Sequence, residues 1–78
     1  MVNEQRKVDE MYLKLKYNEL LKRYYNGCIY IIENPNEFSK YLPNVLDFKK
    51  QLEKTIMLIE KVHGKVSEDE ILNGFIIR

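Results

Sequence analysis

Cys28 and His63 are the residues best suited to metal or thiol chemistry, and the chain of 78 residues holds one cysteine and one histidine. A metal ion needs several ligands that converge at roughly 2.0–2.3 Å. In an antiparallel helical hairpin that reverses between residues 33 and 44, these two side chains stand roughly 20 Å apart. We therefore expect no metal site and no cofactor. We interpret Cys28 as a small buried apolar residue and His63 as a helix C-terminal residue favoured by the helix dipole.

Acidic residues are the remaining candidates for catalysis, and they occur in two groups, residues 9–10 and residues 68–70. Both groups stand near expected helix N-termini, where acidic side chains complement the helix dipole. The sequence contains no glycine-rich phosphate loop, no G-x-S-x-G motif and no H-E-x-x-H motif. We therefore expect a protein without enzymatic activity.

Basic and aromatic residues interleave over residues 14–25, a pattern that suggests nucleic-acid binding because basic groups hold phosphates and aromatic rings stack on bases. One outward face of the expected helix carries the candidates Tyr12, Lys16, Arg23 and Tyr30. A solvated helix face explains the same residues, since Glu19 lies among them and no helix-turn-helix spacing is evident. Nucleic-acid binding is therefore the alternative function.

Positioning these side chains requires helices, and the strongest signal in the sequence is an amphipathic helix over residues 8–33. Its apolar stripe comprises Leu13, Tyr17, Leu20, Leu21, Tyr24, Cys28, Ile31 and Ile32. Part of the stripe follows 4-3-4-3-4 spacing, which is typical of coiled-coil-like packing, and Gly27 within it would allow close backbone approach. We expect a helical bundle.

Pro35 ends the first helix, because a residue before proline disfavours helical torsion angles. We expect a turn and a short helix over residues 34–43, then a second long helix over residues 44–63 with Asn44 as its capping residue and Gly64 as its C-terminal stop. The alternative is a second helix that begins at Asn36 or Ser39, with Pro43 near its first turn. The second stripe comprises Val45, Phe48, Leu52, Ile56, Ile59 and Val62.

Ser67 and Glu70 form an S-x-x-E capping box, which predicts a third short helix over residues 67–73. The tail over residues 75–77 is too apolar to remain in solvent, so we expect it to pack on the hairpin or on a partner. The predicted fold class is all-α. One helical domain over residues 1–78 forms a long antiparallel helical hairpin with a short third C-terminal helix.

This fold leaves more apolar surface than one small chain can cover. The residues expected at a self-association or partner interface are Met11, Leu15, Tyr25, Ile29, Leu46, Met57, Phe75 and Ile77. Fully burying each such side chain contributes roughly 1.5–3 kcal/mol, which a marginal domain needs. We expect homodimerisation to complete a bundle. A monomeric three-helix fold and an unknown protein partner are the alternatives.

The composition of the chain indicates its charge, its cellular location and its origin. The chain has 13 basic and 12 acidic residues, a net charge of +1 that a strongly basic DNA-binding protein would not show. With no secretory leader pattern and no apolar run that could span a bilayer, we expect a cytoplasmic protein that does not contact membranes. Abundant Lys, Asn, Ile and Tyr, which have AT-rich codons, favour a low-GC bacterium or its phages or plasmids. The sequence therefore predicts a small helical protein-interaction or regulatory module.

Overall fold

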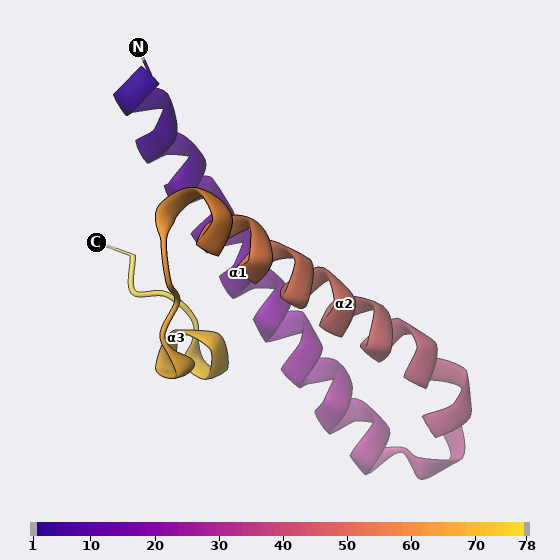
Figure 1. Cartoon of the computed structure of the whole chain (residues 1–78). Helices are drawn as coiled ribbons and strands as arrows, with labels where there is room; N and C mark the ends of the chain where they lie inside the picture. Colours follow the sequence, from indigo (N-terminus) through magenta and orange to yellow (C-terminus); the bar gives the residue numbers. More distant parts are fainter. Residues whose placement is uncertain (1, 78) are drawn as a thin grey trace.

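The computed structural model describes the backbone of residues 2–77 and the side chains of residues 10–77. Its elements are α1 (Val2–Glu33), the 3-10 helix η1 (Pro35–Glu37), α2 (Phe38–His63) and α3 (Glu68–Asn73). The long helices α1 and α2 run antiparallel, and α3 lies beside the middle of α1 (Figure 1). The described part of the chain has no strand, so the predicted all-α hairpin with a short third helix is confirmed.

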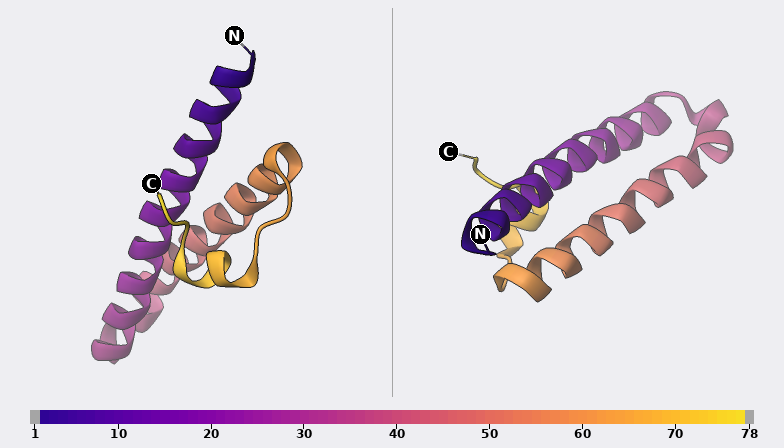
Figure 2. Two further views of the ribbon diagram at one scale, coloured as in Figure 1. Left: turned by 90° about the vertical axis from the view of Figure 1, so that its left-hand side faces the viewer. Right: turned by 90° about the horizontal axis from the view of Figure 1, so that it is seen from above.

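The two long helices pack through the predicted apolar stripes. The buried apolar residues of the hairpin are Tyr17, Leu20, Leu21 and Ile31 on α1 and Val45, Leu52, Ile56 and Ile59 on α2. At Gly27 the helices approach closely, since a Cβ atom there would lie 3.1 Å from Val45 Cγ2. Two predicted stripe residues, Ile32 and Val62, are exposed. Ile32 lies at the turn end of the hairpin, which α3 does not cover (Figure 2).

Helix α2 begins at Phe38, which corrects the prediction of a separate short helix over residues 34–43 and a cap at Asn44. Pro43 lies inside α2, where it removes the one hydrogen bond that its N–H would donate to the Ser39 carbonyl. Two residues before Pro43, the Tyr41 ring meets the Tyr30 ring edge-on with centroids 5.1 Å apart. The first helix is also longer than predicted, since α1 begins at Val2 rather than at residue 8.

The predicted capping box of α3 is confirmed. The Glu70 N–H donates to Ser67 Oγ at 3.1 Å, and the Ser67 N–H donates to Glu70 Oε1 at 3.1 Å. The bond from the Ser67 backbone, together with that from its hydroxyl, holds the pKa of Glu70 below its ordinary value. Gly74 follows α3 with a φ of 90°, a conformation that favours glycine.

Three side chains of α1 hold α3 and the tail in place. The Tyr17 hydroxyl donates to the Ile71 carbonyl at 2.5 Å, and the Tyr25 hydroxyl donates to the Leu72 carbonyl at 2.6 Å. These bonds satisfy carbonyls at the end of α3 that have no partner within a helix. Asn18 binds the tail backbone twice, donating to the Phe75 carbonyl at 2.8 Å and accepting from the Phe75 N–H at 2.7 Å.

Phe75 therefore belongs to the core of the chain. It was predicted at an interface, but it is 6% exposed and its ring meets the Tyr17 ring edge-on at 5.4 Å between centroids. The expectation that the tail packs back on the hairpin holds for Phe75. The next residue, Ile76, is exposed.

The Asn18 contacts predict a measurable loss of stability. We expect Asn18→Ala to lower the free energy of unfolding by about 1–3 kcal/mol, because it leaves both backbone groups of Phe75 without their partner. Asn26→Ala is the matched control, since Asn26 is exposed on the same helix and such surface changes cost less than about 0.5 kcal/mol. Urea denaturation followed by circular dichroism measures both variants at one protein concentration. Equal effects would contradict the role of Asn18.

The capping box predicts a pH dependence that Glu70→Gln removes. The folded-state pKa of Glu70 lies below its ordinary value of 4.5, so the carboxylate contributes stability above that value and loses it as the pH falls through the lowered pKa. We expect the wild-type protein to be more stable than the variant at neutral pH, with a difference that shrinks on acidification below 4.5. Urea denaturation across this pH range measures the difference, and a constant difference would exclude the linkage.

Candidate docking groove

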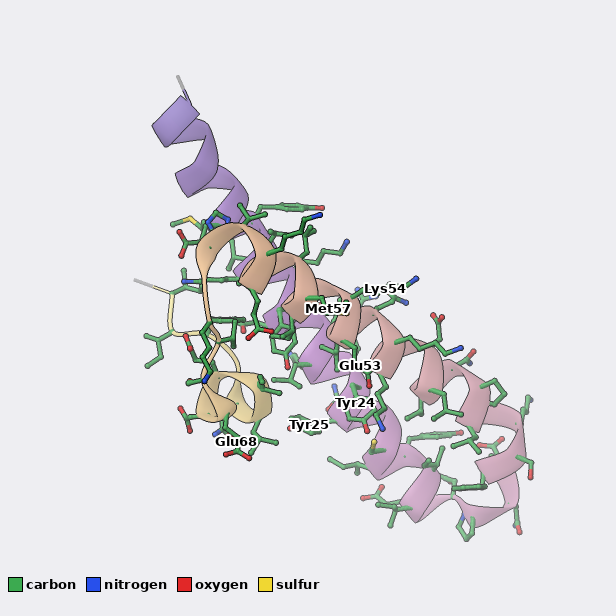
Figure 3. The ribbon with its side chains drawn as sticks, in the orientation of Figure 1. Tyr24, Tyr25, Glu53, Lys54, Met57 and Glu68 are labelled. Carbon is green, nitrogen blue, oxygen red and sulfur yellow. The ribbon has the colours of Figure 1, made fainter. Side chains whose placement is uncertain are left out.

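A groove of about 540 Å³ opens where α3 meets the hairpin. Its walls are Tyr17, Leu21, Tyr24 and Tyr25 of α1, Lys49, Leu52, Glu53, Ile56 and Met57 of α2, and Ile71 and Leu72 of α3. Figure 3 shows Tyr24 and Tyr25 on the same side of the hairpin as Glu53 and Met57. Most of these side chains are apolar or aromatic, the composition that is usual in binding clefts.

Helical spacing explains why these side chains share the groove. Lys49, Glu53 and Met57 recur every four residues and therefore lie on one face of α2. On α1, Tyr24 and Tyr25 stand side by side with ring centroids 5.7 Å apart. The groove thus has an apolar floor, and Lys49 and Glu53 are its charged members.

Hydroxyl groups in the groove are already engaged or poorly hydrated. The Tyr17 and Tyr25 hydroxyls donate to carbonyls of α3. Burial raises the pKa of Tyr17, and burial together with the neighbouring Cys28 raises the pKa of Tyr24. Both shifts leave the phenols of Tyr17 and Tyr24 protonated at physiological pH.

The structure divides the predicted interface residues. Tyr25 and Met57 line the groove, and Met57 is the more open, with 69% of its surface exposed. Ile29 and Leu46 are exposed one or more helical turns from the groove. The other exposed candidates, outside the groove lining, are Met11, Leu15 and Ile77. Leu72 was not predicted at an interface, and it lines the groove where the Tyr25 hydroxyl binds its carbonyl.

The predicted nucleic-acid face is exposed, but acidic residues engage half of it. Arg23 Nε pairs with Glu19 Oε1 at 3.2 Å. The Tyr30 hydroxyl donates to the Glu37 carboxylate, and the Tyr30 ring contacts Tyr41. Negative charge therefore lies beside two of the four groups that a phosphate or a base would contact. Lys16 and Tyr12 are the other two members of the face.

The His63 region links the ends of the two long helices. His63 Nδ1 lies 3.7 Å from Glu10 Oε2, and Lys14 Nζ pairs with Glu10 Oε1 at 2.8 Å. The hydrogen bond from Lys14 holds the pKa of Glu10 below its ordinary value. His63 Nε2 is buried without a hydrogen-bond partner among the described residues. Across the part of the chain that the structure describes, no three His, Cys, Asp or Glu residues lie close enough to hold a metal ion.

Comparisons with protein-family models, with curated proteins and with solved structures find no match for this chain. Among the helices described, none combines the length and the apolar character needed to cross a membrane. The groove is therefore the feature of the molecule from which a function can be proposed.

The Tyr30 contact predicts an unusual titration. The hydrogen bond to Glu37 raises the pKa of Tyr30 to about 12, because it stabilises the protonated phenol beside a carboxylate. We expect Glu37→Gln to return the pKa of Tyr30 toward its ordinary value of 10.0. Ultraviolet difference titration measures the shift, with Tyr30→Phe subtracted to isolate this phenol. An unchanged titration in Glu37→Gln would show that the contact is not formed in solution.

Proposed function

We propose that this protein is a non-enzymatic interaction module that binds a macromolecular partner through the groove between α1, α2 and α3. The observation that carries the proposal is an apolar groove of about 540 Å³ with exposed Tyr25, Met57 and Leu72 at its edges. Tyrosine and methionine are enriched at protein interfaces, and methionine adapts to irregular surfaces.

An amphipathic helix is the element that suits this groove. Such a helix presents apolar side chains at three- and four-residue intervals, which can enter a groove between packed helices. Lys49 and Glu53 carry opposite charges one helical turn apart on the α2 wall. A partner helix with a complementary pair of charges would bind in a single orientation.

We propose further that the module regulates its partner by binding and not by catalysis, and that it acts in the cytoplasm. A phage- or plasmid-encoded origin is part of the same proposal. Nucleic-acid binding through Tyr12, Lys16, Arg23 and Tyr30 is the alternative. Its electrostatic contacts would weaken steeply with salt, whereas capture in an apolar groove resists salt. Salt dependence of binding therefore separates the two functions.

Met57 and Leu58 provide a matched pair of variants for the test. They are neighbours on α2, both exposed, and Met57 lines the groove whereas Leu58 does not. We expect the wild-type chain to capture a partner protein from a host lysate in a way that resists salt, and M57D to fail to capture it. The loss of affinity should be roughly tenfold or larger, as for a buried contact. L58D should retain it.

Circular dichroism of both variants shows that they remain helical. Capture that survives M57D but fails in L58D would overturn the assignment of the groove. Binding of DNA or RNA that is lost at high salt, and also lost in Lys16→Ala, would support nucleic-acid binding instead.

A further inference from the structure

We propose that the occupant of the groove is a second copy of this chain, so that two hairpins pack face to face and each inserts the apolar residues of its turn end into the groove of the other. This inference rests on the groove of the proposed function and names its partner. Three observations support it: the exposed area of the chain, the continuity of one apolar face, and the balance of charge.

The exposed area is larger than a compact monomer of this mass requires. The chain exposes 6353 Å² at 9.4 kDa, whereas about 5,000 Å² is expected for a compact monomer. The Cα radius of gyration is 14.6 Å, against about 11.5 Å for a compact domain of this length. A specific interface takes about 800 Å² from each partner. The elongated hairpin accounts for part of the excess, and exposed apolar side chains such as Met57 and Ile32 make apolar area available for an interface.

The groove continues along one face of the hairpin into a set of protruding apolar residues, which we call the turn ridge: Ile29, Ile32 and Leu46. On α1, Ile29 and Ile32 follow Tyr25 by four and seven residues, intervals that return to the same helix face. On α2, Leu46 precedes Glu53 by seven residues. Ile32 is 76% exposed, and α3 leaves the turn end of the hairpin open (Figure 2).

A two-fold axis converts this arrangement into a closed dimer. The groove and the turn ridge lie one after the other along the same face, so an axis between them brings each ridge onto the groove of the other copy. The long helices then form an antiparallel four-helix arrangement. Each α3 is one wall of the groove, so it contacts the turn ridge of the partner that enters there.

Charge permits this association of like chains. Basic and acidic residues number 13 and 12, so two copies do not repel each other through their net charge. On the groove wall, Lys49 and Glu53 supply both signs within one helical turn. The wall therefore adds no net charge that would repel the turn ridge of a second copy.

Sedimentation equilibrium of the full chain at micromolar concentrations tests the proposal. We expect the wild-type protein to sediment at twice 9.4 kDa. M57D in the groove and I32D in the turn ridge should each raise the dimer dissociation constant roughly tenfold or more, whereas L58D on the other face of α2 should leave it unchanged. Circular dichroism confirms that each variant remains helical.

Mixing complementary variants sharpens the test. In a mixture of M57D with I32K, one contact pairs an acidic groove with a basic ridge and the other contact keeps both wild-type surfaces. For an equimolar mixture, we expect native mass spectrometry to show a share of heterodimer above the one that random pairing gives. A statistical or lower share of heterodimer would contradict the ridge-in-groove arrangement, as would a dimer that L58D dissociates and M57D does not.

The outcomes separate this inference from the proposed function. A chain that stays monomeric at all concentrations overturns the inference, while capture of another protein that M57D abolishes would still support the interaction module. A groove-dependent dimer that captures no other macromolecule supports the inference and overturns the role in binding a different partner.

Discussion

The position of Tyr17 determines how the rest of this small fold is arranged. Its ring is almost fully buried between the helices, and a buried phenol needs a partner for its hydroxyl. The Ile71 carbonyl provides that partner, because the last carbonyls of a helix have no N–H donor within the helix. This one hydrogen bond satisfies both the buried hydroxyl and the free carbonyl, and it holds α3 against the middle of α1. Two more side chains of α1 bind the backbone of this region: the Tyr25 hydroxyl donates to the Leu72 carbonyl, and the Asn18 amide donates to the Phe75 carbonyl.

Chain connectivity and tertiary contacts together place α3. It follows α2 after residues 64–67, which can span at most about 14 Å, so it cannot reach Ile32 at the turn end of the hairpin. Within that reach, the hydroxyls of Tyr17 and Tyr25 bind carbonyls of α3, and Phe75 is buried directly after it. The groove therefore opens where α3 meets the hairpin, and the turn end stays uncovered.

The sequence predicted what local patterns encode. The hairpin and the α3 capping box depend on residues a few positions apart, and both are confirmed. The favoured start of α2 at Asn44 was too late, because Pro43 suggests a boundary although a proline near the start of a helix removes only one hydrogen bond. No local pattern identified the role of Asn18, because its partner is distant in the sequence. That partner, Phe75, lies 57 residues away, beyond any helical periodicity.

The candidate site was predicted only in part for the same reason. Periodicity identified Tyr25 and Met57 as surplus apolar residues, but a groove needs a third wall, and Leu72 reaches it through a tertiary hydrogen bond. Among the described side chains, sixteen large apolar residues are exposed and ten apolar residues are buried. The polar groups that fix α3 find partners inside the chain, whereas much of its apolar surface does not. Recognition by the interaction module that we propose would depend on shape and apolar contact, with Lys49 and Glu53 setting orientation, since the balanced charge of the chain offers little long-range attraction to any partner.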